Sequence, residues 1–213
     1  MSQQHRPGSV YCIDHYVVPT NDILTWQSFM ENVLGGQLHK LGGLSTAERL
    51  RRGPIRIMMN VSDRHQIGGF LQNDMLPEPS TRGGAPRFGY FIRSEDVSLH
   101  LRRLEQFDIP HSEPIKTSEE GQEGTAIHFE DPDGNQLEFW APTHLPAGAL
   151  STTNPTGVGR ISHAVQESRD LSKTVEFYSR YCGLDLIESA DIPKDTVAME
   201  MTGGGRLVFK QVD

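Results

Sequence analysis

The chain has 213 residues, of which 36% are hydrophobic and 23% are charged, and its formal net charge is -8. This composition is typical of a globular protein with a buried core. The acidic balance argues against nucleic-acid and anionic-membrane partners, because both attract clustered Lys and Arg. No apolar run is long enough for a membrane span or a secretory leader, and Cys12 and Cys182 are too few for a disulfide framework. We therefore expect a cytoplasmic protein.

The two ends of the chain share one pattern at a constant offset. The matching pairs are Ile13/Ile161, His15/His163, Asp22/Asp170, Phe29/Phe177 and Gly35/Gly183. A weaker third copy begins at Phe88, at the position where the other two copies carry histidine. The chain is therefore predicted to contain three related units.

Each copy predicts a strand, then a helix, then about three strands. In the first copy a strand over 11–18 precedes a helix that is capped by Asn21 or Asp22 and ends at Gly35. In the middle copy the strand covers 88–92, and the helix is capped by Ser94 or Asp96. In the last copy the helix begins after Asp170 and ends at Gly183. Further strands are predicted over 55–61, 66–71, 125–129, 137–140, 197–201 and 207–211.

A stretch rich in Pro, Gly, Ser and Thr separates the second unit from the third. We interpret residues 142–157 as a linker. Residues 1–141 then hold two paired units, and residues 158–213 hold the third, which would begin a second, incomplete domain. A lone third unit would leave an unpaired sheet edge. We therefore expect either a homo-oligomer in which two copies of this unit pair, or a natural C-terminal quarter that this sequence lacks.

The segment 129–138 contains a tight turn within Asp131-Pro132-Asp133-Gly134-Asn135. With the turn centred on Asp133, His128 faces Glu138 across the hairpin, and both side chains point to the same face of the sheet. A carboxylate in a buried apolar strand needs a partner. The hairpin thus predicts a hydrogen bond between His128 and Glu138.

The repeated strand histidine, its helix pattern and the turn before Leu137-Glu138 together resemble the vicinal oxygen chelate superfamily. This superfamily contains glyoxalase I, extradiol ring-cleaving dioxygenases, fosfomycin-resistance proteins and bleomycin-binding proteins. The resemblance implies an α+β fold of repeated βαβββ modules whose strands form half-open β-barrels. It is greatest to a two-domain extradiol dioxygenase that lacks its last module, because His163 opens a further unit after the linker.

The resemblance also implies a divalent metal, with His15, Glu138 and His163 at ligand positions. His128 stands where extradiol enzymes and fosfomycin-resistance proteins usually carry an active-site tyrosine. This position implies a third metal ligand or a proton shuttle, and the alternative is a histidine that only hydrogen-bonds Glu138. Fe(II) is the expected metal, and Mn, Ni or Zn are alternatives. Because His163 has no further ligand in its own unit, we expect any metal in this chain to lie at His15 and Glu138. Phe88 stands where the family would supply another histidine.

Three functions remain open from the sequence. The first is a metal-dependent, extradiol-type dioxygenase that cleaves a catechol-like substrate. The second is a glyoxalase-like lyase or isomerase, which needs a metal but no oxygen. The third is a non-catalytic small-molecule-binding protein of the bleomycin-resistance type, which Phe88 favours for the first domain.

Overall fold

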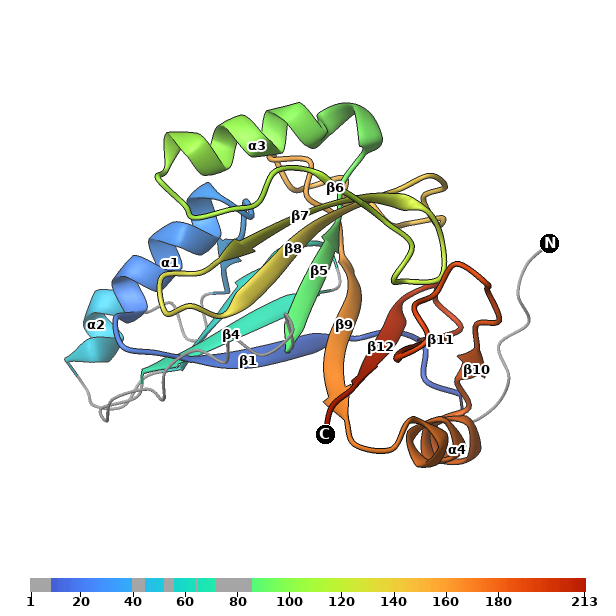
Figure 1. The fold of residues 1–213 in the computed structure, drawn as a ribbon. Helices are drawn as coiled ribbons and strands as arrows, with labels where there is room; N and C mark the ends of the chain where they lie inside the picture. Colours follow the sequence, from blue (N-terminus) through green and yellow to red (C-terminus); the bar gives the residue numbers. More distant parts are fainter. Residues whose placement is uncertain (1–8, 40–44, 52–55, 64, 72–85) are drawn as a thin grey trace.

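The computed structural model describes residues 9–39, 45–51, 56–63, 65–71 and 86–213, and within them the chain forms three successive βαβββ modules (Figure 1). The first module consists of β1 (His15–Thr20), α1 (Ile23–Asn32), β2 (Gln37–Leu38), a short α2 (Thr46–Leu50), β3 (Arg56–Asn60) and β4 (Gln66–Leu71). The second consists of β5 (Arg87–Phe91), the 3-10 turn η2 (Ser94–Asp96), α3 (Val97–Gln106), β6 (Ile115–Thr117), β7 (Gly124–Glu130) and β8 (Gln136–Pro142). The third consists of β9 (Ile161–Ser168), α4 (Leu171–Cys182), β10 (Asp185–Leu186), β11 (Thr196–Glu200) and β12 (Arg206–Gln211).

Helices α1 and α4 begin where the sequence predicts, and α4 also ends there, whereas α1 ends at Asn32, before the expected Gly35. The Asp22 side chain accepts hydrogen bonds from the backbone N–H groups of Leu24 and Thr25, and Asp170 accepts one from the N–H of Lys173. Gly183 ends α4 in the left-handed conformation, with φ of 64°. Side-chain capping therefore fixes the start of α1 and α4, whereas α3 follows η2 without a side-chain cap bond.

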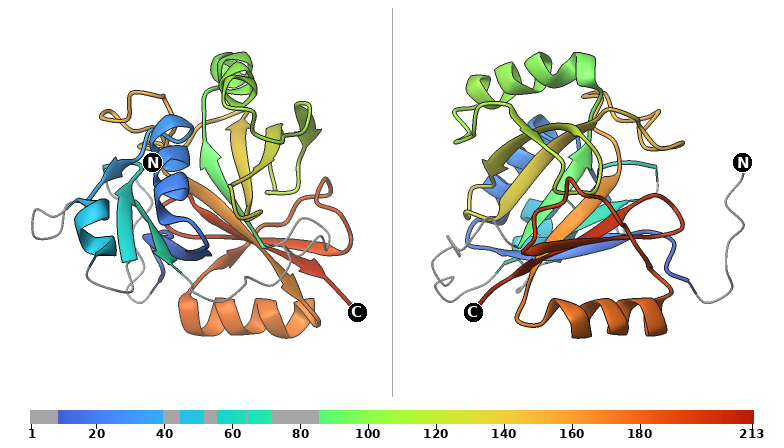
Figure 2. Two further views of the ribbon diagram at one scale, coloured as in Figure 1. Left: turned by 90° about the vertical axis from the view of Figure 1, so that its left-hand side faces the viewer. Right: turned by 45° about the vertical axis from the view of Figure 1, so that its right-hand side comes forward.

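The strands form two curled sheets, and this mixed α+β arrangement with a half-barrel confirms the predicted fold class. The first module alone makes a four-stranded sheet in the order β1-β4-β3-β2. The other two modules share an eight-stranded sheet in the order β10-β11-β12-β9-β5-β8-β7-β6. In the views of Figure 2, α4 and α3 lie at opposite ends of this arrangement.

The pairing of modules differs from the one expected from sequence. We expected the first two modules to be paired and the third to stand alone, but β9 of the third module pairs antiparallel with β5 of the second. The strand edge that motivated the homo-oligomer is thus hydrogen-bonded within the chain. Sheet pairing joins residues far apart in sequence, and the repeat pattern does not state which module pairs with which. The homo-oligomer stays a prediction, but the fold does not require it.

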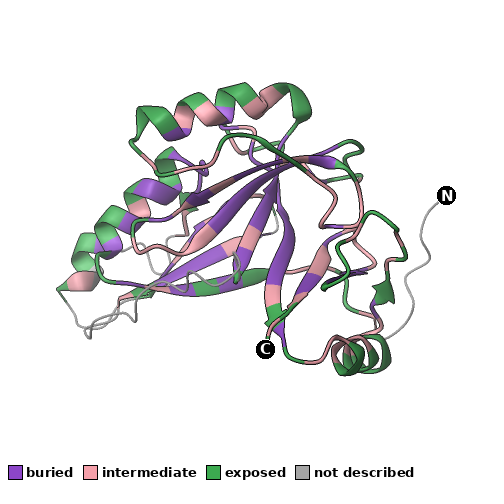
Figure 3. Cartoon of the chain, viewed as in Figure 1, coloured by how far each residue is buried: buried purple, intermediate pink, exposed green. Residues whose placement is uncertain are grey.

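The first module instead packs against the second through side chains. The rings of Tyr16 and Phe88 stack with centroids 3.7 Å apart, and the hydroxyl groups of Tyr16 and Tyr90 are hydrogen-bonded. Residues of both modules contribute to one buried apolar cluster, in which Phe29 of α1 lies against Phe129 of β7. Much of β5, β8 and β9 is buried (Figure 3). No helix in the described part of the chain is long and apolar enough to span a membrane.

Candidate metal centre

The β7–β8 hairpin has the predicted register, in which His128 pairs with Glu138. Its turn is held by Asp131, whose Oδ1 accepts hydrogen bonds from the N–H groups of Asp133 and Asn135. Gly134 takes a φ of 80°, which favours glycine. The turn therefore fixes which residues of β8 face the concave side of the sheet together with His128.

A row of three residues crosses the eight-stranded sheet at the junction of the second and third modules. Gly89 on β5 pairs with Glu138 on one side and with His163 on the other. A Cβ atom placed on Gly89 would lie only 2.2 Å from Cε1 of His163, so the imidazole covers the space above this glycine. Because residue 89 lacks a side chain, the side chains of Glu138 and His163 can meet across β5.

Glu120, in the turn that follows β6, completes a buried cluster of three groups. Nε2 of His163 lies 3.5 Å from Oε1 of Glu138 and 3.6 Å from Oε1 of Glu120. Each of the three residues is at most 1% exposed. Their ligand atoms lie within 4.8 Å of one another, and this is the one group of three or more such residues in the described segments.

Burial and charge act differently on the two carboxyl groups of the cluster. Burial, together with the charge of Glu138, raises the pKa of Glu120 to about 7. Burial alone would also raise the pKa of Glu138, but His163, His128 and Arg87 hold that pKa well below its ordinary value. Burial would lower the pKa of His163, yet the two carboxylates raise it. Glu138 is therefore the permanent anion of the cluster, and Glu120 exchanges a proton near neutral pH.

Arg87 supplies a buried positive charge beside this cluster. Its Nε lies 2.7 Å from Oε2 of Glu138, and its Nη2 donates a 2.7 Å hydrogen bond to Glu119. Lys210 also pairs with Glu119, and Arg206 donates to the backbone carbonyl of Glu120. These contacts hold the 119–120 turn of the second module against strand β12 of the third.

The structure brings three of the four predicted site residues together. His128 places Nε2 3.2 Å from Oε2 of Glu138, and its side chain is 34% exposed, so it forms the solvent-facing edge of the cluster. His15 is not part of the cluster. Its Nδ1 lies 2.9 Å from a carboxylate oxygen of Asp14, and its side chain is 53% exposed. The expected combination of His15 with Glu138 is absent from the described residues because β1 belongs to the other sheet.

The strand registers change the assignment of Phe88. In each module the first strand pairs in parallel with the last strand. These pairings begin at His15 in the first module, Arg87 in the second and His163 in the third. Arg87 therefore takes, in the second module, the position that histidine takes in the other two. Phe88 points to the opposite face, because successive side chains alternate along a strand, and it stacks on Tyr16. Alignment of the repeats by sequence was displaced by one residue here.

Sequence reasoning missed Arg87 and Glu120. Arg87 could have been identified because it is a charged residue at the start of the apolar run Phe88-Gly89-Tyr90-Phe91. The adjacent acids Glu119 and Glu120 before strand β7 are a weaker signal, since acidic turns are common on protein surfaces.

The donor atoms of the cluster fit a divalent cation. Both oxygens of Glu120 and Oε1 of Glu138 are buried and accept no hydrogen bond from the described residues. Distances of 3.5 and 3.6 Å are long for hydrogen bonds. They are close to the roughly 3.4 Å that separates ligands around a tetrahedral cation with bonds of about 2.1 Å. One imidazole and two carboxylates would thus hold a metal with a modest contraction of the cluster.

Comparison with known proteins agrees with this architecture. Residues 12–139 match the family model of the Glyoxalase/Bleomycin resistance protein/Dioxygenase superfamily. No curated protein matches the sequence. A crystal structure of a putative dioxygenase from Bacillus subtilis is 18% identical, with a TM-score of 0.75, and the match covers 96% of this chain and 64% of that protein. This chain therefore spans less than two thirds of that relative.

Two shorter solved structures match part of the chain. The fosfomycin resistance protein FosX from Listeria monocytogenes is 18% identical, with a TM-score of 0.47, over 62% of this chain and 92% of its own. An integron cassette protein from V. cholerae is 23% identical, with a TM-score of 0.47, over 62% of this chain and 96% of its own. On the match of residues 12–139, the chain belongs to the glyoxalase/bleomycin resistance protein/dioxygenase superfamily.

Proposed function

We propose that the chain binds a divalent metal through Glu120, Glu138 and His163 and acts on a small molecule that offers two neighbouring oxygen atoms to that metal. The observation that carries this proposal is the set of buried carboxylate oxygens that accept no hydrogen bond and converge with Nε2 of His163. Leaving such atoms buried without a partner is costly, and a cation would supply the missing partner. Superfamily membership supports the same chemistry.

The donor set favours Fe(II) or Mn(II). Carboxylate oxygens suit Mn and other hard cations, while imidazole suits Fe, Zn, Ni and Cu. The metal preference of one imidazole with two carboxylates lies between these two groups of metals. When bound, such a metal would polarise the oxygens of a chelating substrate. We propose Fe(II) and a catechol-like substrate, in an extradiol-type dioxygenase reaction of the whole protein.

The residues of the chain have separate tasks in this proposal. Glu138 supplies a permanent negative charge, and Arg87 holds its Oε2 in place. Glu120 releases its proton near neutral pH and then offers a second carboxylate. His128 faces solvent at the edge of the cluster, where it can exchange a proton with a bound substrate hydroxyl.

Activity measurements on the protein reconstituted with iron test this proposal. We expect ring-fission products from at least one member of a catechol panel in the presence of oxygen. His128→Gln is expected to lower kcat at least tenfold and keep the metal. If the iron-loaded protein leaves every catechol intact but converts glyoxal hemithioacetals without oxygen, the glyoxalase-like alternative replaces the dioxygenase.

A second candidate, a metal-free binding protein of the bleomycin-resistance type, is favoured by one contact. Arg87 stands at the strand position of a ligand histidine and already neutralises Glu138 at 2.7 Å. In this role the buried cluster would be structural. The metal content of the purified, metal-supplemented protein distinguishes the two candidates, since this one predicts none.

A further inference from the structure

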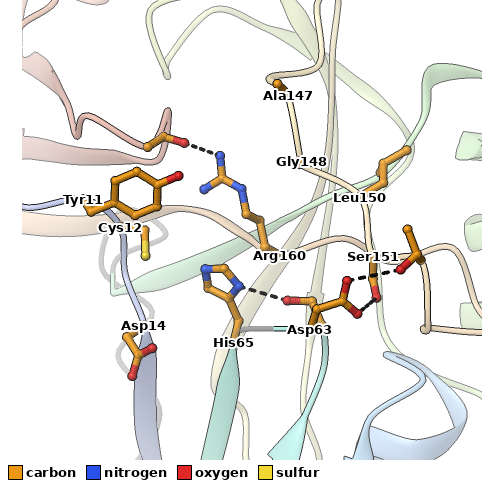
Figure 4. A pocket seen from close by; sticks show the side chains of 13 residues that line it. Tyr11, Cys12, Asp14, Asp63, His65, Ala147, Gly148, Leu150, Ser151 and Arg160 are labelled. Carbon is orange, nitrogen blue, oxygen red and sulfur yellow. Dashed lines mark hydrogen bonds between the residues drawn. The ribbon is translucent and has the colours of Figure 1, made fainter. Parts of the chain in front are cut away.

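A cavity lies outside the metal cluster and shares no residue with it (Figure 4). It has a volume of about 420 Å³, which is within the range of small-molecule sites. Its walls come from the segment before β1, the β3–β4 turn, the segment that precedes β9 and the β11–β12 hairpin. The first module, the third module and the segment between β8 and β9 therefore contribute to it.

Arg160 is the buried charge of this cavity. The residue is only 7% exposed, and its guanidinium points into the cavity beside Tyr11 and Cys12 (Figure 4). Nη2 donates a hydrogen bond to the carbonyl of Gly203, and the guanidinium carbon lies 5.3 Å from the centre of the Phe91 ring. These contacts fix the side chain but leave its charge without an anion.

No carboxylate of the described residues forms an ion pair with Arg160, whereas Arg87 has two carboxylate partners and Arg206 has one. A buried cation without a counter-charge is costly, and a ligand carboxylate would remove that cost. The planar guanidinium is also suited to hold a carboxylate through two parallel hydrogen bonds. Arg160 thus defines the end of the cavity at which an anionic group would bind.

The carboxylates among the described residues of the cavity wall restrict the ligand to a single negative charge. Asp14 and Asp63 line its wall, and both are already engaged: Asp14 with His15, and Asp63 with the hydroxyls of Ser151, Thr152 and Thr153. Two nearby carboxylates would repel a phosphate dianion or a dicarboxylate. Leu150 and the ring of Tyr11 provide apolar wall for an uncharged body.

We propose that this cavity binds a small monocarboxylate with an apolar or aromatic body, its carboxylate on Arg160. The site is separate from the metal cluster, so binding does not depend on the metal. Arg160 lies just before β9 and lines this cavity, whereas His163 lies within β9 and belongs to the metal cluster.

Calorimetric titration of the whole chain with benzoate, benzamide and inorganic phosphate tests this proposal. We expect saturable binding of benzoate below 1 mM, about the strength that a small ligand with one charged anchor reaches, and at least tenfold weaker binding of the other two. Arg160→Met should weaken benzoate binding at least tenfold, and Arg169→Met, an exposed arginine outside the cavity, should leave it unchanged.

Two further variants keep the test decisive if Arg160→Met fails to fold. Ala147→Trp adds a large side chain at the exposed rim of the cavity and should weaken benzoate binding with Arg160 intact. Glu138→Gln should leave benzoate binding unchanged even if it abolishes metal binding. Three results would each overturn the proposal. They are equal affinity for benzoate and benzamide, full benzoate affinity in Ala147→Trp, and no binding of benzoate at 10 mM, which is roughly tenfold above the expected dissociation constant.

Discussion

The imidazole of His163 lies directly over Gly89, its partner on the neighbouring strand, so that a Cβ atom at residue 89 would be 2.2 Å from Cε1. Neither group can move far, because His163 is 1% exposed and β5 is paired on both sides. The contact between the second and third modules therefore depends on a residue without a side chain.

Replacing Gly89 by Ala should displace His163 from Glu138 and Glu120. We expect a loss of about 1–3 kcal/mol in the free energy of unfolding, as for other overpacked core positions. Metal affinity should fall at least tenfold. Gly205→Ala is the matched control, since its nearest neighbour is the flexible end of Met201 at 3.2 Å. Urea unfolding and metal titration measure both effects, and unchanged metal affinity in Gly89→Ala would contradict the geometry of the cluster.

A bound metal should partly compensate the loss of stability that follows when the positive charge of Arg87 is removed. Without Arg87, the anion Glu138 stays buried with one cationic contact fewer, and loss of one partner of a buried pair typically costs about 3–5 kcal/mol. We expect Arg87→Met to lower Tm in chelator, and Mn(II) to restore more of that loss than it adds to the wild type. Arg102→Met, on the exposed face of α3, is the control. Equal stabilisation of both proteins by Mn(II) would show that Arg87 and the metal do not act on the same carboxylate.

Because His100 is buried, we expect the protein to lose stability in mild acid, independently of the metal. His100 is fully buried on α3, with its ring 4.7 Å from that of Phe139, and burial lowers its pKa from 6.5 to about 4. Between these values the unfolded chain binds a proton that the folded chain does not, so stability falls as pH decreases.

Comparison of His100→Leu with the wild type isolates this contribution. From pH 7.5 to pH 5 the wild type should lose about 2 kcal/mol more than the variant, by proton linkage. Urea unfolding at the two pH values, in chelator, measures the difference. Parallel pH dependence of the two proteins would mean that His100 titrates normally in the folded state.

The sequence predicted the parts of this fold that depend on neighbouring residues. Asp22 and Asp170 cap their helices, and Gly183 ends one, because each acts on backbone groups within a few positions. The His128–Glu138 pairing followed from the turn that joins their strands. These features need no knowledge of the rest of the chain.

The composition of the cluster could not be predicted in the same way. Glu138 and His163 meet because β5 pairs with both of their strands, and that pairing joins modules separated by a long connection. Glu120 reaches them through a turn positioned by the contacts of Arg87, Glu119 and Arg206. A one-residue displacement in the repeat alignment also hid Arg87, since it exchanged the two faces of the strand.

The most direct test of a metal site at Glu120, Glu138 and His163 is the metal content of four variants and the wild type. It is measured after loading with Fe(II) or Mn(II) and removal of excess ion. Wild type and Glu130→Gln, the same change elsewhere on the β7–β8 hairpin, should hold about one metal per chain, the content of a single three-ligand site. Glu138→Gln and His163→Ala should each hold several-fold less, because each removes one of three ligands. His15→Ala should keep its full content, since His15 lies outside the cluster. A His15→Ala protein without metal, together with a fully loaded His163→Ala protein, would contradict the account and place the site on the first module.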